Sequence, residues 1–463
     1  MSSLPDVATW IREQLPTLAE KYGVPGAAVA VLAGDQVVEA ATGVLSTATE
    51  VTATTDSLFQ IGSVTKLWTS TLVMQLVDEG RVDLEAPVRT WLPEFRVADE
   101  AAAAAITVRH LLDHTSGFEG DIFTDTGTGD DCLERFIEVL ADVPQLFPPG
   151  ERFSYNNAGY CVLGRLVEVL RGKTYDQCLR DHLFTPLGLT HAATGPYEAI
   201  LYRVAVGHIE TGPGAGYEPA PVWALARSNA PAGSMLAMRP ADLIAFARMH
   251  LGDGKAADGT QVLAPGTAAR MHEKQVELPY LGVMGTSWGL GFERFDRPGA
   301  EGGELIGHDG NTIGQAAFLR MVPLAGVAVA LLTNGGDAAM LYRDVVDHVL
   351  TELTGSGLPP LPTPPAEPAR IDASRFVGTY SAQVADLTVS QDEDGRIWML
   401  QTPRGIFEDL GERPERKELL AYREDSLIPA EPSQGLYIPH VFLGDDGQGR
   451  ALYLHVGRAI RRA

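Results

Sequence analysis

Six prolines crowd into the ten residues between Pro359 and Pro368, and this segment most restricts how the chain can fold. Proline has a fixed φ and no backbone N–H, so neither a helix nor a central strand can pass through such a run. The segment is expected to be a stiff, extended spacer. With 463 residues, the chain also exceeds the size at which one hydrophobic core stops growing. We therefore predict two domains, 1–356 and 371–463, joined by a linker over 357–370.

The first predicted domain carries strand-like segments at both ends and mostly helical patterns between them. This order is typical of an α+β domain in which both ends of the segment build one antiparallel sheet. The helical stretch is then an insert into that sheet. The segments concerned are a helix over 5–21, strands over 26–32 and 36–42, a second strand pair over 313–321 and 326–333, and a helix over 338–353.

Downstream of the prolines, short strand-like runs alternate with turn residues such as Asp394-Gly395 and Asp446-Gly447. Many short strands with turns of this kind indicate a small antiparallel barrel. We therefore predict that 371–463 is a β-barrel domain. Its expected strands lie over 376–380, 387–390, 397–401, 418–422, 440–443 and 452–455.

Charge and cysteine content narrow the partners and the compartment. The chain has 60 acidic and 36 basic residues, a net charge of −24. A surface this negative repels phosphate backbones and anionic lipids, so we expect neither nucleic-acid binding nor membrane docking. We expect a cytoplasmic protein, because the first residues lack the basic start and apolar run of a secretion signal. Cys132, Cys161 and Cys178 are odd in number and lack metal-ligand spacing, which fits reduced, packed thiols.

The first candidate for chemistry is Ser63-Val64-Thr65-Lys66, at the start of a helical pattern that ends at Gly80. A serine at a helix N-terminus lies where unpaired N–H groups favour negative charge. Lys66 lies three residues later, on the same face, and can reach the serine hydroxyl. Serine becomes a good nucleophile only when a neighbouring group takes its proton, and this spacing supplies one. The alternative is a plain capped helix.

Two further segments offer polar groups next to predicted elements. Tyr155-Asn156-Asn157 precedes an apolar helix and can place a proton shuttle and an amide-binding group beside a serine. A helix N-cap is the alternative there. Gly307-His308-Asp309-Gly310-Asn311 precedes the predicted strand over 313–321. Its glycines let a substrate backbone approach closely and expose an N–H as an oxyanion donor, and a hairpin turn is the alternative.

Taken together, the order Ser-x-x-Lys, Tyr-x-Asn, His-x-Gly resembles the penicillin-binding-protein and class C β-lactamase superfamily of serine acyl enzymes. The resemblance extends over most of residues 20–335. It implies a β-lactamase/transpeptidase-like domain followed by a barrel similar to a lipocalin-like module. In length and layout the chain is most similar to stand-alone penicillin-binding-protein-type thioesterases. Further segments that resemble the family are 80–88, 106–117, 186–189 and 231–234.

The resemblance also implies a role for each motif residue. Ser63 is the expected acylated nucleophile. Lys66 and Tyr155 are its expected proton-transfer partners, the Lys66 charge favouring the phenolate of Tyr155, and which of the two takes the serine proton stays open. The other implied roles are amide binding by Asn157, an oxyanion hole from the N–H groups of Ser63 and Asn311, close substrate approach at Gly310 and proton transfer at His308.

Histidine at position 308 is a departure from many family members, which carry lysine in a Lys-Thr-Gly motif. An ammonium suits the fixed carboxylate of a β-lactam, whereas His308 suits a neutral group and can assist proton transfer. We therefore do not expect efficient β-lactam hydrolysis. His110 and His114 lack the Glu of a His-Glu-x-x-His zinc motif, and we interpret them as hydrogen-bonded scaffold. No metal and no cofactor is expected.

The similar thioesterases imply a cytosolic enzyme that takes a nonribosomal peptidyl thioester, free or bound to a carrier protein, and closes it head to tail, typically at a C-terminal D-residue. A thioester acylates serine readily, and a tethered amine outcompetes water through its effective concentration. The alternative is an esterase or a D-stereospecific peptidase with water as acceptor. A catalytically silent ligand-binding protein is a third hypothesis, and the intact motif set argues against it.

The segment 457–463 places three arginines within five positions of an otherwise acidic chain. We hypothesise that Arg458 turns towards the active-site cleft and contacts a substrate carboxylate or carbonyl. The alternative is a solvated basic tail that pairs with the acidic surface.

Overall fold

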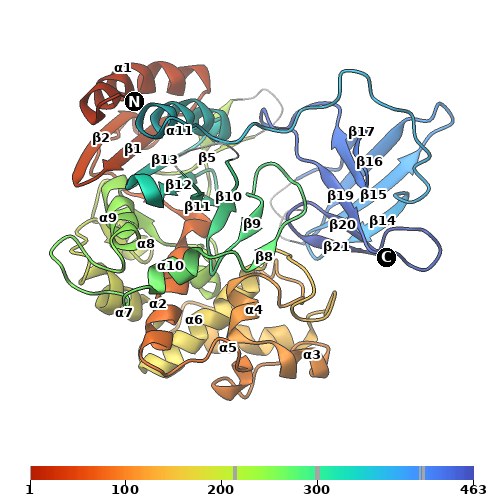
Figure 1. The fold of residues 1–463 in the computed structure, drawn as a ribbon, viewed down its shortest axis with the longest axis horizontal. Coiled ribbons are helices and arrows are strands. Elements are labelled where there is room, and N and C mark those ends of the chain that lie inside the picture. Colours follow the sequence, from red (N-terminus) through yellow and green to blue (C-terminus); the bar gives the residue numbers. More distant parts are fainter. Residues whose placement is uncertain (1, 212–215, 298–302, 406–407, 409–411) are drawn as a thin grey trace.

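The computed structural model describes residues 2–211, 216–297, 303–405, 408 and 412–463. These residues form an α+β part and a β-barrel that lie side by side (Figure 1). The segment 355–377 between them contains no helix or strand. It runs along the α+β part, where Arg343 Nη1 donates to the Pro359 carbonyl at 2.7 Å.

An antiparallel sheet, with eight strands in the described part of the chain, organises the α+β part. β1 and β13 are neighbours in this sheet and pair from Ala27 with Thr333 to Ala33 with Val327, so the two ends of the domain meet as predicted. In spatial order the strands are β2 (Gln36–Gly43), β1 (Gly26–Ala33), β13 (Val327–Thr333), β12 (Ala316–Val322), β11 (Leu305–Asn311), β10 (Glu293–Phe295), β9 (Ser287–Trp288) and β8 (Val276–Glu277).

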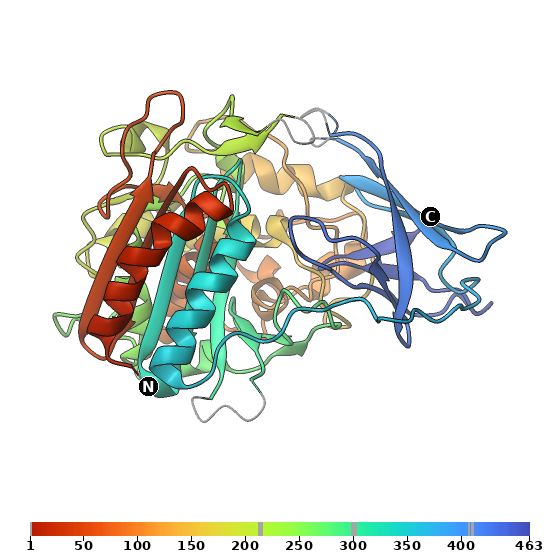
Figure 2. The ribbon, with the colours of Figure 1, turned by 90° about the horizontal axis from the view of Figure 1, so that it is seen from above.

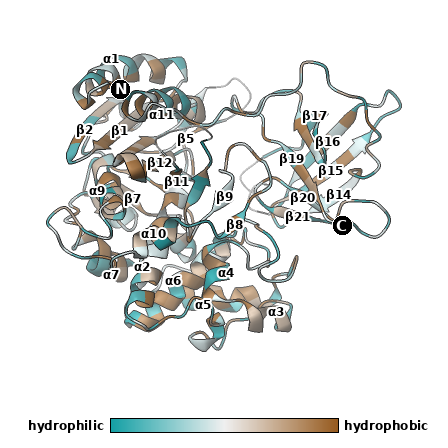
Figure 3. Cartoon of the chain, in the orientation of Figure 1, coloured by the Kyte–Doolittle hydropathy of each residue, from teal (hydrophilic) through white to brown (hydrophobic). Residues whose placement is uncertain are grey.

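Two helices, α1 (Leu4–Lys21) and α11 (Ala338–Thr354), cover one face of this sheet (Figure 2). α1 begins after the N-cap Ser3, whose backbone N–H donates to the Asp6 carboxylate at 3.1 Å. Val7, Ile11 and Leu15 recur every four residues and face the sheet. α1 also carries hydrophilic residues, as its teal segments show (Figure 3). This layer closes one face and leaves the other for the site.

Helices of the insert cover the opposite face, with α2 (Thr65–Asp78) at their centre. All residues of α2 from Thr65 to Leu76 are buried, as expected for a helix surrounded by other elements. The other helices are α3 (Glu100–Ala105), α4 (Val108–Leu112), α5 (Cys132–Val139), α6 (Asn157–Arg171), α7 (Tyr175–Leu179), α8 (Pro196–Ala199), α9 (Pro240–Leu251) and α10 (Thr267–His272). Short strands are β3 (Phe59–Gln60), β4 (Ala192–Ala193), β5 (His208–Glu210), β6 (Tyr217–Pro219) and β7 (Ala237–Met238).

The second part is a closed antiparallel barrel, with eight strands among the residues described. Inward side chains such as Tyr380, Leu387, Phe442 and Leu454 form its apolar core. The interior is therefore packed with side chains, as in other small barrels. Its strands are β14 (Gly378–Ser381), β15 (Ala385–Gln391), β16 (Ile397–Pro403), β17 (Glu415–Arg423), β18 (Ser426–Pro429), β19 (His440–Leu443), β20 (Tyr453–His455) and β21 (Ala459–Arg462).

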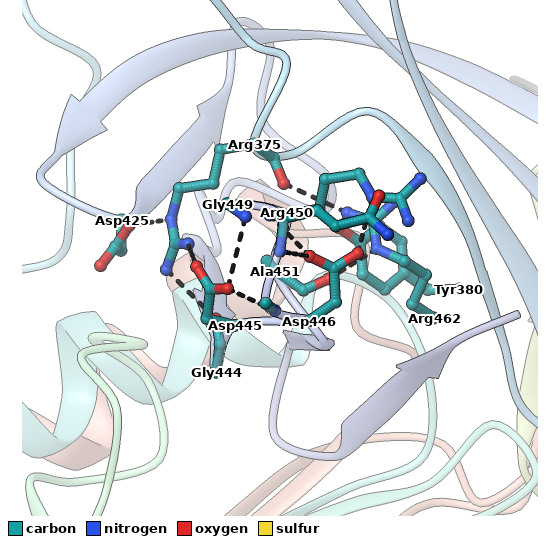
Figure 4. Close-up of polar contacts among 12 residues, drawn as sticks. Arg375, Tyr380, Asp425, Gly444, Asp445, Asp446, Gly449, Arg450, Ala451 and Arg462 are labelled. Atoms are coloured by element: carbon teal, nitrogen blue, oxygen red, sulfur yellow. Dashed lines mark hydrogen bonds and ion pairs between the residues drawn. The ribbon is translucent and has the colours of Figure 1, made fainter.

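Polar contacts fasten the last strand into the barrel (Figure 4). Arg462 donates from Nε to the Ala451 carbonyl and from Nη2 to the Tyr380 hydroxyl, each at 2.6 Å. Nearby, Arg375 Nε donates to Asp425 at 2.7 Å. The turn that precedes β21 is therefore carried by a well-anchored strand.

Two sequence expectations differ from the structure. The C-terminal segment is not a solvated basic tail, because 459–462 pairs with β14 and β20 as strand β21. His308 lies inside β11 and not in a hairpin turn, and the next strand begins at Ala316 rather than at residue 313. The glycines of the segment resemble turn formers, but they serve close backbone packing. A Cβ at Gly310 would lie 1.9 Å from the Ile61 carbonyl oxygen.

Candidate active site

Ser63 lies in a 3₁₀ turn, Gly62–Val64, that leads directly into α2. Both neighbours of Ser63 are buried and Ser63 itself is partly exposed. Glycines allow the surrounding backbone to close on this turn. A Cβ at Gly233 would lie 2.2 Å from the Gly62 carbonyl oxygen, and one at Gly310 would lie 3.0 Å from Ser63 N. The turn is thereby held between β11 and the segment that follows Pro231.

Lys66 contacts the Ser63 hydroxyl directly. Its Nζ donates to Ser63 Oγ at 3.0 Å and to the Ala232 carbonyl at 2.7 Å. The side chain is completely buried, and burial lowers the pKa of Lys66 to about 7. A neutral amine beside the serine is therefore accessible near neutral pH, which suits proton acceptance.

Tyr155 completes the surroundings of Ser63. Its side chain is 5% exposed, and Lys66 Nζ lies 4.8 Å from the centroid of its ring. Burial raises the pKa of Tyr155 well above its ordinary value, and the hydrogen bond with Ser63 lowers it by less. The expectation that the Lys66 charge favours the phenolate is therefore wrong, because desolvation dominates. Both Lys66 and Tyr155 therefore contact the Ser63 hydroxyl, and which of them takes the serine proton is a matter for the proposed mechanism.

The barrel supplies part of this site through the turn between β20 and β21. Gly457 O accepts a hydrogen bond from Tyr155 N at 3.0 Å. On either side, His455 Nε2 bonds to the Phe153 carbonyl at 2.9 Å and Ala459 N donates to Ser154 Oγ at 3.0 Å. The segment that carries Tyr155 is therefore held by a domain more than 200 residues away in the sequence.

Asn157 and Arg458 meet at a residue that the sequence analysis missed, Asp121. Asn157 Nδ2 donates to Asp121 Oδ1 at 2.6 Å, and Arg458 Nε donates to Asp121 Oδ2 at 2.8 Å. The guanidinium carbon of Arg458 lies 4.8 Å from the centroid of the Tyr155 ring. Of the two alternatives for Arg458, the structure favours the one that turns it towards the site. Asp121 follows no local motif, so only the fold reveals it.

His308, Gly310 and Asn311 line the other side of Ser63, on β11. The His308 ring lies 6.1 Å from that of Tyr155, and its Nδ1 bonds to the Asp309 carbonyl at 2.6 Å. Burial lowers the pKa of His308 to about 3, so the ring is neutral and Nε2 is an acceptor. Asn311 N lies close to the serine turn, because a Cβ at Gly62 would lie 2.6 Å from it.

Histidines outside the motif act as scaffold, as predicted. His114 Nδ1 accepts a hydrogen bond from Asn156 N at 2.9 Å, and the His114 ring lies 4.4 Å from that of Tyr155. His110 Nδ1 accepts from Thr107 N at 3.2 Å. Asn156 is the N-cap of α6 and accepts from Gly159 N at 2.7 Å. The helix-cap alternative therefore applies to Asn156, which leaves Asn157 free for the site.

A buried charge cluster lies next to β11. Arg320 Nη2 is 2.7 Å from Asp309 Oδ1 and 3.7 Å from Glu293 Oε2, and all three residues are largely shielded from solvent. Burial raises the pKa of both carboxyls. Gly307 pairs with Glu293 on one side and with Arg320 on the other, which brings these two residues to the same level of the sheet.

The assembled groups suit acyl transfer at Ser63. A serine hydroxyl, a buried amine and nearby backbone N–H groups are the parts that form and stabilise an acyl-enzyme. Within the ranges that the structure describes, no group of three or more His, Cys, Asp or Glu side chains is arranged to hold a metal ion. In the same ranges, no helix has the length and apolar character needed to cross a membrane.

Known proteins are similar in sequence to most of this chain. A family model described as beta-lactamase matches residues 11–350. Penicillin-binding protein 4 of Amycolatopsis lactamdurans is 48% identical over 380 residues, which are 82% of this chain and 98% of that protein.

Solved structures show the same architecture. SurE is similar over 100% of both chains, with 28% identity and a TM-score of 0.79. SurE with D-Leu covers 99% of this chain and 100% of that chain, with 29% identity and a TM-score of 0.78. The D-amino acid amidase of Ochrobactrum anthropi SV3, complexed with D-phenylalanine, covers 76% of this chain and 99% of that chain, with 25% identity and a TM-score of 0.62. The likeness to SurE thus includes the barrel.

Proposed function

This chain belongs to the beta-lactamase family of serine hydrolases, and we propose that within it the protein is a thioesterase that releases and macrocyclises a nonribosomal peptide. The observation that carries the proposal is the bond from Lys66 Nζ to Ser63 Oγ at 3.0 Å, in a site that also holds Tyr155. The proposed substrate is a peptidyl thioester, free or on a carrier protein. The proposed compartment is the cytoplasm, which suits three free, buried cysteines.

In the first step, Ser63 Oγ attacks the thioester carbonyl and passes its proton to Lys66. The N–H groups of Ser63 and Asn311 are proposed to bind the oxyanion. The carbon–sulfur bond then breaks, and the thiol leaves with a proton from Lys66. The peptide is now bound to Ser63 as an ester.

In the second step, the peptide's own N-terminal amine attacks the ester carbonyl. Lys66, neutral again, takes the amine proton and returns it to Ser63 Oγ as the ester bond breaks. The products are a cyclic peptide and free enzyme. Folding the tethered amine towards the ester gives it a high effective concentration relative to water.

Substrate recognition is proposed to involve the groups around Tyr155. Asn157 offers a carboxamide to an amide of the acyl chain, and Arg458 offers a guanidinium to a carbonyl or carboxylate. A D-residue at the acyl position is supported by the descriptions of two neighbours, SurE solved with D-Leu and an enzyme named D-amino acid amidase. With a pKa of about 3, His308 is a weak base near neutral pH, so we propose that its Nε2 assists proton transfer only by accepting a hydrogen bond.

Water is the competing acceptor. The likeness to the D-amino acid amidase favours a second candidate function, in which the same Ser63 ester is hydrolysed and the protein acts as an esterase or a D-stereospecific peptidase. Both functions use the same acylation step, so they differ only in what attacks the ester.

Product analysis by mass spectrometry tests the proposal. The enzyme is incubated with a linear peptidyl thioester that has a free N-terminal amine and a C-terminal D-residue. Ser63→Ala removes the nucleophile, and Ser374→Ala, at an exposed position in the barrel domain, is the matched control. A product one water lighter than the free acid, lost only in Ser63→Ala, supports cyclisation. Free acid alone supports the hydrolase, and an unchanged product in Ser63→Ala overturns both.

A further inference from the structure

Asp121 joins three parts of the molecule that are remote in sequence. Its carboxylate accepts hydrogen bonds from Asn157 Nδ2 at 2.6 Å, from Arg458 Nε at 2.8 Å and from Arg458 Nη2 at 3.3 Å. Its side chain is 12% exposed. The loop that carries it is tied to α6, because Ala158 N donates to the Gly120 carbonyl at 2.9 Å. Asp121 therefore has a fixed place between α6 and the barrel.

This contact determines which way the Asn157 carboxamide is turned. A carboxylate accepts hydrogen bonds and does not donate them, so the atom of Asn157 that faces Asp121 must be Nδ2. Oδ1 then points away from Asp121, and no residue in the described ranges donates to it. Oδ1 is an acceptor, which is what the N–H of a substrate amide requires. A neutral amide in place of Asp121 has both a donor and an acceptor, so it could hydrogen-bond to either Nδ2 or Oδ1 of Asn157 and would not fix the orientation of the carboxamide.

The same contact determines which edge of Arg458 is free. Asp121 occupies Nε and Nη2, whereas Nη1 has no partner among the residues described. The Arg458 side chain remains 39% exposed and lies beside the Tyr155 ring. Two donors are thus engaged by the protein, and one edge is left for a ligand. The negative charge of Asp121 also offsets the positive charge of Arg458 close to Lys66.

We propose that Asp121 is a positioning residue that makes the site selective for peptidyl acyl groups. It presents Asn157 Oδ1 to an amide N–H of the acyl chain and the Nη1 edge of Arg458 to a carbonyl or carboxylate of the same chain. An acyl group that lacks the amide N–H and the second carbonyl or carboxylate is not bound more tightly because of Asp121. The inference rests on the proposed function of Ser63 as the acylated residue, and it holds whether an amine or water attacks the ester.

Two substrates separate this role from simple structural support. p-Nitrophenyl acetate has neither an amide N–H nor a second carbonyl, whereas a peptidyl thioester with a C-terminal D-residue has both. Asp121→Asn should lower kcat/KM for the peptidyl thioester about 10- to 100-fold, mainly through KM, because hydrogen bonds to a charged group are lost. At a pH above the Lys66 pKa, where the charge of Asp121 no longer changes the protonation of Lys66, its kcat/KM for the acetate should fall far less than that for the peptidyl thioester.

Asp425→Asn is the matched control, because Asp425 also accepts from an arginine Nε, at 2.7 Å, but within the barrel (Figure 4). We expect it to leave both substrates unaffected. Arg458→Ala adds a double-mutant cycle. If Asp121 acts through Arg458, Asp121→Asn should cost clearly less on the peptidyl thioester in the Arg458→Ala background than in wild type.

The outcomes separate the inference from the proposed function. Equal losses on both substrates, or no loss on the peptidyl thioester, would overturn the role of Asp121. So would identical losses of Asp121→Asn in the wild-type and Arg458→Ala backgrounds. If wild type and Ser63→Ala turn over both substrates equally, the proposed function itself fails, and the inference fails with it.

Discussion

Gly310 offers a direct test of the proposed oxyanion hole. In Gly310→Ala, the new Cβ would lie 1.9 Å from the Ile61 carbonyl oxygen and 3.0 Å from Ser63 N. Both are backbone atoms, so no flexible side chain can move aside. An ordinary carbon–oxygen contact is about 3.3 Å. The substitution must therefore separate β11 from the serine turn by more than about 1 Å.

A separation of this size has a large kinetic effect. Misplacing reacting groups by about 1 Å costs about 100-fold in rate, and removing one oxyanion donor costs about 100- to 1,000-fold in kcat. We expect Gly310→Ala to slow acylation of Ser63 by about 100-fold or more. Overpacking should lower the free energy of unfolding by about 1–3 kcal/mol, which most proteins of this size tolerate.

The assay is single-turnover release of p-nitrophenolate from an activated ester, with urea unfolding measured on the same samples. Gly195→Ala is the matched control, because its Cβ would meet only Met235 Sδ, at 3.9 Å, and its acylation rate should stay within about twofold. If folded Gly310→Ala acylated Ser63 at the wild-type rate, β11 would not contribute to the oxyanion hole and the reasoning would be refuted.

Three further predictions concern protonation and packing. Burial lowers the pKa of Lys66 to about 7, and only the neutral amine accepts the Ser63 proton. The value of kcat/KM should therefore fall about tenfold per pH unit below that pKa and level off above it. A flat profile between about pH 5 and 8 would contradict this role of Lys66. Arg320→Met removes the cation that lies 2.7 Å from Asp309 Oδ1 and should lower the free energy of unfolding in urea at about pH 9, where Glu293 is also ionised, by about 3–5 kcal/mol. A loss below about 1 kcal/mol would show that the cluster is not electrostatically coupled. Ser154→Ala removes the hydroxyl that accepts a hydrogen bond from Ala459 N of the barrel, and it should lower the free energy of unfolding by about 1–3 kcal/mol in thermal unfolding. An unchanged midpoint would mean that this hydrogen bond does not hold the barrel.

Patterns that depend on near neighbours could be predicted from the sequence. The proline run separates the two parts because each proline blocks helix and ladder bonds by itself. Ser63 and Lys66 are three residues apart, so helix geometry alone brings them together, and the structure has them 3.0 Å apart. Most barrel strands were also recognisable from alternation and turns. β18 and β21 were missed, because β18 is buried on both faces and shows no alternation, and β21 carries two of the arginines that resemble a basic tail.

Other features depend on groups that only the tertiary structure brings together. The residues of the Asp121–Arg458 contact are 337 positions apart, and no local pattern predicts which of three nearby arginines reaches the site. Protonation was equally inaccessible, because it depends on burial. The sequence placed Lys66 beside Ser63, but the surrounding protein removes water from both Lys66 and Tyr155 and so favours a neutral amine over a phenolate. Residue identity and helix geometry therefore set which groups are present and how far the nucleophile lies from Lys66. The burial that shifts their pKa values, and the barrel's share in the site, arise only once distant segments pack against one another.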